Sequence, residues 1–162
     1  MQARPSVRVL VVDDEAPARL ALRTLLREDP DVEVVGECAN GAEAGPSIRE
    51  LRPDLVFLDV QMPGGSGFDV MEALGEPAGP AVIFVTAHAE HALRAFDVQA
   101  VDYLLKPFDD DRFGRALARG KEAVRRRRAL ALAGHLAALL GEPAGTADPP
   151  DTQGAPLERF TV

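Results

Sequence analysis

The sequence predicts an α/β fold: a doubly wound parallel sheet of five strands with five helices, the last of them extended. Two observations lead to this prediction. Short apolar runs alternate along the chain with amphipathic segments of helical period. The runs are continuously apolar, which is typical of parallel strands that helices cover on both faces. Right-handed crossovers between such strands then give the doubly wound arrangement.

The elements follow one another in strict alternation. The first apolar run, Val7–Val12, precedes an amphipathic segment in which Pro17 suits the first helical turn. The last helix is expected to open at Asp109, because the three aspartates at 109–111 favour the positive end of the helix dipole. Strands are therefore expected at residues 7–12, 32–37, 55–58, 81–85 and 101–105, and helices at 16–27, 41–51, 67–74, 88–97 and from 109 onward.

Two features depart from a regular alternation. Gly45 and Pro46 fall inside the helix expected at 41–51, and a proline within a helix costs about 3 kcal/mol. That helix therefore either begins at Pro46 or is kinked there. The last helix runs past residue 125 into leucines at 130, 132, 136, 139 and 140. Exposed leucines require a partner, so this helix is expected to pair with its counterpart in a homodimer or to pack against an output domain.

Composition and charge exclude several classes of protein. The 162 residues carry 18 Lys and Arg against 26 Asp and Glu, and the net charge of −8 disfavours nucleic-acid binding by this chain. Cys38 is the only cysteine, which excludes an internal disulfide and a thiolate zinc site and predicts a reducing, cytoplasmic location. No segment approaches the roughly 18 apolar residues of a membrane span, so no membrane association is expected.

Polar residues at the ends of the strands form one candidate site. Asp13, Asp14 and Glu15 follow the first strand, Asp59 ends the third and Thr86 the fourth, while the fifth leads into Lys106. In a parallel sheet these ends meet at one edge, where ligands bind. Neighbouring carboxylates repel by roughly 4 kcal/mol per close pair, so they require a counter-charge. Oxygen ligands suit Mg²⁺ or Mn²⁺, and no His or Cys is placed to favour zinc.

Each of these residues also has a simpler interpretation. Asp13 and Asp14 can cap the following helix, Asp59 can occupy a turn, Thr86 can cap the next helix, and Lys106 can be a solvated charge. Four independent coincidences at four strand ends are improbable. The convergence therefore favours a shared site.

Four segments resemble the receiver domain of two-component response regulators over roughly residues 7–125. They are Val12-Asp13-Asp14-Glu15, Leu58-Asp59-Val60-Gln61-Met62-Pro63-Gly64, Val85-Thr86-Ala87 and Asp102-Tyr103-Leu104-Leu105-Lys106-Pro107-Phe108. The wording of residues 86–96 and 100–108 is further similar to the LytTR (LytR/AlgR-like) subgroup, whose receivers precede a DNA-binding domain built of strands. The resemblance implies the flavodoxin-like receiver fold.

The resemblance also implies a phosphoryl acceptor and a metal site. Asp59 would receive a phosphoryl group from a phosphohistidine of a sensor histidine kinase. Asp14 would bind Mg²⁺ or Mn²⁺ directly and Asp13 through water, while Asp59 and the backbone carbonyl of Gln61 would complete the protein ligands. The side chain of Gln61 would not be a ligand.

Four further residues take roles from the same resemblance. Thr86 would donate a hydrogen bond to the phosphoryl oxygen, and Lys106 would pair with its charge, in a transfer that consists mostly of positioning and electrostatics. Tyr103 would be the aromatic switch, whose ring turns inward when Thr86 moves toward the phosphate. Pro107 would follow a cis bond from Lys106.

The resemblance implies a division of the chain into a receiver domain at 1–125, an extension of the last helix at 126–140, a flexible Pro- and Gly-rich linker at 141–156, and the start of a LytTR-type DNA-binding domain at 157–162. The chain is expected to be truncated before the rest of that domain. DNA binding is expected only through the missing domain. Phosphorylation is expected to switch conformation or promote a homodimer and so control transcription.

Two other functions are less well supported by the sequence. A phosphatase that uses the same aspartate chemistry usually carries a second acid two residues after the nucleophile, where this chain has Gln61. The protein is therefore not expected to be an enzyme beyond self-phosphorylation and slow self-dephosphorylation. A phosphate-independent binding module of the same fold is the alternative, and it is disfavoured because the whole set of acidic, hydroxyl and lysine residues is present.

Overall fold

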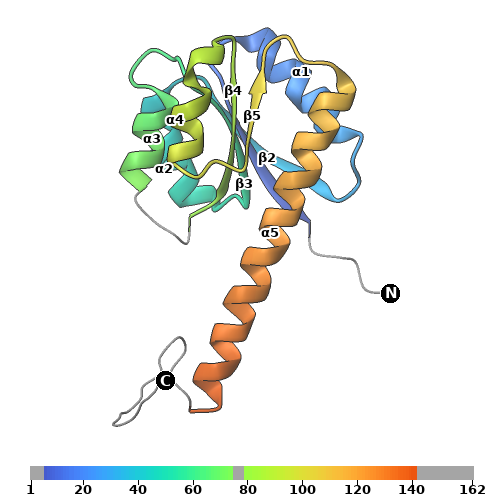
Figure 1. Ribbon diagram of the computed structural model, residues 1–162, viewed down its shortest axis with the longest axis vertical. Coiled ribbons are helices and arrows are strands. Elements are labelled where there is room, and N and C mark those ends of the chain that lie inside the picture. Colours follow the sequence, from blue (N-terminus) through green and yellow to red (C-terminus); the bar gives the residue numbers. More distant parts are fainter. Residues whose placement is uncertain (1–5, 75–78, 142–162) are drawn as a thin grey trace, which may run out of the picture. The chain divides into compact units, whose positions relative to one another are not determined.

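The computed structural model describes residues 6–74 and 79–141, which contain a five-stranded parallel sheet in the order β2-β1-β3-β4-β5 (Figure 1). The chain forms two compact units that divide between Arg125 and Arg126. The elements in chain order are β1 (Val7–Val12), α1 (Ala16–Arg27), β2 (Val32–Cys38), α2 (Gly41–Leu51), β3 (Leu55–Asp59), α3 (Gly67–Leu74), β4 (Ala81–Thr86), the 3₁₀ helix η1 (Ala89–His91), α4 (Ala92–Asp97), β5 (Asp102–Leu105) and α5 (Asp110–Leu139). The doubly wound parallel fold predicted from the sequence is confirmed.

The sheet separates two apolar cores, because successive side chains of a strand point to opposite faces. Val9 and Val11 of β1 belong to the core that α1 and α5 cover, whereas Leu10 and Val12 belong to the core beneath α2, α3 and α4. All five residues of β3 and all six of β4 are buried. Burial on both faces explains why these strands are continuously apolar in the sequence.

The register of the strands brings their carboxyl ends to one edge of the sheet. β3 and β4 pair from Leu55 opposite Ala81 to Asp59 opposite Val85, and β1 reaches this edge with Val12 opposite Leu58. Asp59 and Thr86 are the last residues of their strands. The polar residues at the strand ends therefore share one edge.

Side-chain caps fix where three helices begin. The carboxylate of Asp109 accepts a hydrogen bond from the backbone N–H of Arg112 (2.7 Å), so Asp109 caps α5 and the helix proper starts one residue later than predicted. The Asn40 side chain accepts from Glu43 N–H (2.9 Å) at the start of α2. Ser66 and Asp69 exchange hydrogen bonds at the start of α3, as in a capping box.

The structure corrects two of the predicted helices. The helix expected at 88–97 is divided into η1 and the short α4, and residue 88 belongs to neither. α2 begins at Gly41, so a start at Pro46 is wrong; the helix continues through Pro46, which lies on its exposed side. The carbonyl left without a helical N–H partner is that of Ala42, which is also exposed and can be satisfied by water.

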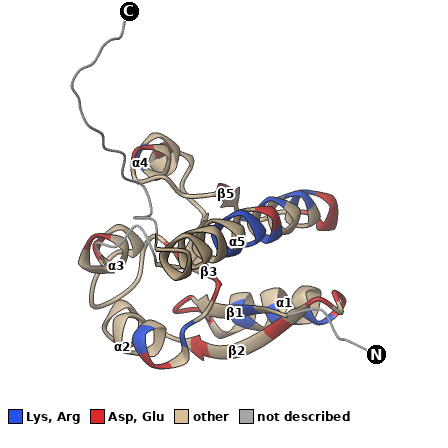
Figure 2. Ribbon diagram, turned by 90° about the horizontal axis from the view of Figure 1, so that it is seen from below, with Lys and Arg blue, Asp and Glu red and all other residues tan. Residues whose placement is uncertain are grey.

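The last helix is extended, as predicted, and runs from Asp110 to Leu139. Acidic residues open it and basic residues follow along it (Figure 2). In the first unit it buries Phe113, Ala116, Leu117 and Gly120. Of the predicted linker (141–156) and the predicted start of a further domain (157–162), all but Gly141 lies outside the described residues.

None of the described helices combines the length and the apolar character that a bilayer crossing requires.

A close backbone contact joins α3 to the end of β3. Gly67 is the first residue of α3, and its N–H donates to the carbonyl of Val60 (2.8 Å). A Cβ atom at this position would lie 2.5 Å from the carbonyl oxygen of Asp59 and 3.1 Å from side-chain atoms of Leu58 and Phe84. Only glycine permits this approach, because a backbone carbonyl cannot be displaced as a flexible side chain can.

We predict that Gly67→Ala lowers the free energy of unfolding by about 1–3 kcal/mol, because the added methyl group forces β3 and α3 apart. Gly114→Ala is the matched control, since a Cβ at Gly114 in α5 would meet nothing within 4 Å. That control should be neutral or stabilising by up to about 1 kcal/mol. Urea denaturation of both variants measures the difference; equal stabilities would contradict the packing argument.

Candidate functional site

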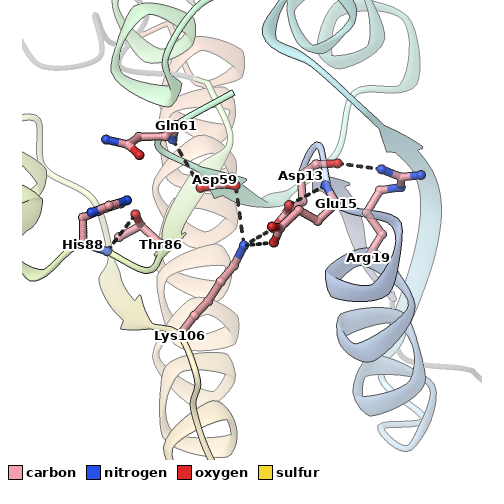
Figure 3. A network of polar contacts seen from close by, with 8 residues as sticks. All are labelled: Asp13, Glu15, Arg19, Asp59, Gln61, Thr86, His88 and Lys106. Carbon is pink, nitrogen blue, oxygen red and sulfur yellow. Dashed lines mark hydrogen bonds and ion pairs between the residues drawn. The ribbon is translucent and has the colours of Figure 1, made fainter. Parts of the chain in front are cut away.

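Three carboxylates and a lysine meet at the carboxyl edge of the sheet (Figure 3). Asp13 follows β1 and is 0% exposed, and Asp59 ends β3 and is 5% exposed. Lys106, which follows β5, extends its ammonium group between them, 2.8 Å from Asp13 Oδ2 and 3.5 Å from Asp59 Oδ2. Glu15 approaches the same ammonium group to 3.3 Å. One fixed cation therefore faces an excess of negative charge.

The position of Lys106 is set by its backbone. Its N–H donates to the carbonyl of Thr86 (2.7 Å), which extends the pairing of β4 and β5 by one step. The bond between Lys106 and Pro107 is cis, as the resemblance implied. Burial alone would lower the pKa of Lys106, but the carboxylates of Asp13, Asp59 and Glu15 outweigh burial and raise it. Lys106 is therefore charged throughout the physiological range.

Whereas the surroundings of Lys106 favour its charged form, those of Asp59 disfavour its charged form. Burial and the neighbouring Asp13 carboxylate raise the pKa of Asp59 from 3.8 to about 6, although Lys106 and the backbone N–H of Gln61 partly offset this. That N–H donates to Asp59 Oδ1 at 3.2 Å. The Asp59 carboxylate is thus a buried, poorly compensated anion that gains from any further positive charge.

The residues present fit a divalent cation. Carboxylate oxygens of Asp13, Asp14 and Asp59 lie within 4.8 Å of one another, and Asp14 is exposed at the mouth of the group. Among the described residues this is the only such cluster of acidic, histidine or cysteine side chains. An all-oxygen, strongly anionic donor set suits Mg²⁺ or Mn²⁺.

Thr86 and Tyr103 are linked through the backbone of His88. Thr86 is fully buried, and its hydroxyl oxygen accepts a hydrogen bond from the N–H of His88 (3.2 Å). The Tyr103 hydroxyl donates to the carbonyl of the same residue. Tyr103 is half-buried against the core beneath α2, α3 and α4. The hydroxyl groups of Thr86 and Tyr103 are therefore connected through the backbone of one residue.

The structure brings together four predicted site residues, Asp13, Asp14, Asp59 and Lys106. Thr86 is connected to them through its carbonyl, which accepts from the N–H of Lys106. Tyr103 is connected to Thr86 through the backbone of His88. Four contacts were not predicted from the sequence: the two backbone bonds of His88, the ion pair of Glu15 with Lys106, and the hydrogen bond from Arg19 to the Asp13 carbonyl (2.7 Å). Glu15 belongs to the strand-end residues expected to converge, but its pairing with Lys106 was not specified. The backbone contacts of His88 carry no side-chain signal.

We predict that Asp59→Asn stabilises the cation-free protein. The folded-state pKa of Asp59 lies above its unfolded value, so the folded state binds more protons between about pH 4 and 6 and wild-type stability falls as pH rises through that window. At pH 7 the variant should be more stable by up to about 3 kcal/mol, since each pKa unit is worth about 1.4 kcal/mol. Near pH 4 the difference should vanish.

Thermal unfolding in a chelator across this pH range measures the effect. Excess Mg²⁺ should remove most of the difference between the variant and the wild type, because bound cation compensates the Asp59 carboxylate. A variant that is less stable than the wild type at pH 7 in chelator would contradict the prediction.

The sequence matches the model of the response regulator receiver domain over residues 9–118. An uncharacterised response regulatory protein of Yersinia pestis is 49% identical over 113 residues, which are 70% of this chain and 48% of that protein. The transcriptional regulatory protein BtsR of Escherichia coli is 47% identical over 113 residues, which are 70% of this chain and 47% of that protein. This chain therefore spans about half the length of these curated relatives.

Solved structures agree with the sequence match. The response regulatory domain of MrkE from Klebsiella pneumoniae has a TM-score of 0.69 at 29% identity, covering 74% of this chain and 98% of that one. The REC domain of the response regulator AraT from Geobacillus stearothermophilus has a TM-score of 0.68 at 33% identity, covering 75% and 97%. Sheet order, strand-end carboxylates and these matches together show that the chain belongs to the response regulator receiver family.

Proposed function

We propose that Asp59 accepts a phosphoryl group from a phosphohistidine of a sensor histidine kinase, and that this modification switches the protein. The observation that carries the proposal is the Asp59 carboxylate itself: it is 5% exposed, lies 3.5 Å from Lys106 and shares an acidic cluster with Asp13 and Asp14. A buried nucleophile beside a fixed cation and a cation-binding cluster suits phosphoryl transfer, which depends mainly on positioning and charge.

In the proposed transfer an Asp59 carboxylate oxygen attacks phosphorus. An O–P bond forms as the N–P bond of the phosphohistidine breaks, and the imidazole leaves with the electron pair. Lys106 Nζ is within reach of Asp59 and stabilises the negative charge of the phosphoryl oxygens, while Thr86 supplies a hydroxyl donor from the end of the next strand. Asp13 holds Lys106 in place from the other side at 2.8 Å.

A Mg²⁺ or Mn²⁺ ion held by Asp13, Asp14, Asp59 and the backbone carbonyl of Gln61 would neutralise the approaching phosphoryl group. The rest of the chemistry belongs to the chain. Burial of Asp59 excludes bulk water from the nucleophile, and the N–H of Gln61 fixes the orientation of its carboxylate.

The proposed switch passes from Thr86 to Tyr103 and then to the surface of α4, β5 and α5. Beside Tyr103, Asp102 forms a two-pronged ion pair with Arg112 of α5 (2.9 and 3.0 Å), and Arg112 also donates to the Tyr103 carbonyl (2.8 Å). Burial would raise the pKa of Asp102, but hydrogen bonds from Arg112 and the Tyr103 N–H keep it below its usual value. These contacts support a coupling of Tyr103 to α5.

The output of the switch is proposed to be transcription control by a longer protein. The chain spans about half of its curated relatives, one of which is named a transcriptional regulatory protein. The motif wording supports a LytTR-type DNA-binding domain as the missing part, with DNA contacted only there, and an association state that phosphorylation changes. α4 presents Leu93 and Phe96, each 80% exposed, as an apolar surface for such a change.

A kinase docking surface is proposed beside Lys106. An apolar groove lies between α1 and the connection from β5 to α5, and its lining includes Leu20, Ala21, Leu25, Pro107 and Phe108. Leu20 is 54% exposed. A helix of the kinase that occupied this groove would carry its phosphohistidine to the mouth of the site, next to Lys106.

Phosphorylation tests the proposal directly. With Mg²⁺ and acetyl phosphate, the intact wild-type chain should gain one acid-labile and hydroxylamine-labile phosphoryl group by mass spectrometry, and Asp59→Asn should gain none. Glu72→Gln, which alters an exposed carboxylate on α3, is the matched control and should behave as the wild type. A wild type that takes up neither a phosphoryl group nor beryllofluoride would support a phosphate-independent binding module.

Cation binding should depend on pH because Asp59 binds a cation only as a carboxylate. With a pKa of about 6, the Mg²⁺ affinity should be nearly constant above about pH 7 and should fall below about pH 6, approaching tenfold per pH unit. Calorimetric titration at several pH values measures this. Asp59→Asn should bind more weakly and lack this step; a step that persists in the variant would assign it to another group.

A further inference from the structure

The second unit of the chain carries a row of exposed leucines that the phosphoryl site does not use. Leu132, Leu136 and Leu139 are 58%, 50% and 69% exposed. At about 100° per residue, they lie within an arc of about 60° on the helix. Leu140 (77% exposed) directly follows the helix and keeps a hydrogen bond from its N–H to the Leu136 carbonyl (3.0 Å), so it extends this arc to about 100°. We call these four residues the leucine face. Leu130, 73% exposed, lies roughly opposite this face.

The spacing of the leucine face is that of a helix-pairing seam. Ala129, Leu132, Leu136 and Leu139 are separated by three, four and three residues, which is the alternation of the a and d positions of a heptad repeat. Such a seam packs its side chains between those of another helix with the same spacing. A contiguous stripe of exposed leucines on a water-facing helix also marks an interaction surface.

We propose that the leucine face pairs with the same face of a second copy of this chain. A seam of a and d positions is self-complementary, because an identical helix supplies both the knobs and the holes. Residues 142–162 offer no equal partner in their sequence: they contain four prolines, and their large apolar residues are only Leu157, Phe160 and Val162. A sequence of that composition does not repeat the three-and-four spacing.

The length of the seam sets the strength of the pairing. It covers about two heptads, and coiled coils that persist alone usually need three or four. The pair is therefore weak and concentration-dependent, and any second contact between the two copies strengthens it by raising their effective concentration. This goes beyond the proposed phosphoryl transfer and does not rest on it.

Sedimentation of the whole 162-residue chain over a range of concentrations tests the pairing. The triple variant Leu132→Gln, Leu136→Gln, Leu139→Gln removes the seam while keeping residues of good helix propensity. The triple variant should raise the dissociation constant of the dimer by tenfold or more. Leu130→Gln is the matched control: the same chemical change, at an equally exposed leucine of the same helix but off the face, should alter the constant by less than about twofold.

Thiol crosslinking provides a readout that does not depend on the stability of the variants. Leu136→Cys, near the middle of the seam, should give a covalent dimer with a short bifunctional maleimide, whereas Leu130→Cys should not. The native Cys38 is buried, 2% exposed, and the wild type serves as the blank.

Three results would overturn the pairing. They are a wild type that sediments as a monomer at every concentration, a control Leu130→Gln that weakens association as much as the triple variant, and equal crosslinking at positions 130 and 136. Phosphoryl uptake by Asp59 is scored separately by mass, so failure of the phosphoryl-acceptor proposal and failure of the pairing are distinguishable.

Discussion

The organisation of the active edge depends on one electrostatic arrangement, the ammonium group of Lys106 between the carboxylates of Asp13 and Asp59. Asp13 directly follows β1 and Asp59 ends β3, and the parallel register brings the two acids to the same edge. One lysine cannot neutralise them, because Glu15 and Asp14 add further negative charge. The raised pKa of Asp59 records this deficit. The same deficit favours the proposed binding of a divalent cation, which would compensate the charge that Lys106 leaves uncompensated.

Two kinds of contact surround this arrangement. On the α3 side, Gly67 packs directly against the backbone carbonyl of Asp59 and donates to Val60. On the α4 side, the hydroxyl groups of Thr86 and Tyr103 each make a single hydrogen bond to the backbone of His88. Arg112 then ties the Tyr103 backbone and Asp102 to α5. The nucleophile is thus fixed by close packing, whereas the residues proposed to respond to it are held by bonds that can be exchanged.

Much of this could be predicted from the sequence, for a physical reason. Strands buried on both faces must be continuously apolar, so Asp59 and Thr86 stand out as the first polar residues of their segments, and parallel topology brings them together. The division of residues 88–97 into η1 and α4 was not predictable in this way, because Ala, Leu and His satisfy both helix types. The contacts of His88 could not be predicted for a related reason: His88 bonds through its backbone N–H and C=O, and every residue except proline has both groups. Pro46 is a case in which the sequence rule overestimated a cost. The rule penalises a proline inside a helix, but the carbonyl that loses its partner belongs to the exposed residue Ala42, and this lowers the penalty.

The close contact of Gly67 has a consequence for the direction in which a signal travels. On the α3 side, the backbone of Asp59 is in close contact with Gly67, and this contact leaves no room for a single methyl group. In the proposed switch, we therefore expect a change at Asp59 to propagate toward η1 and α4 rather than toward α3. That side carries Leu93 and Phe96 at the surface, so the proposed response would reach an apolar patch, and Gly67 would contribute to its direction.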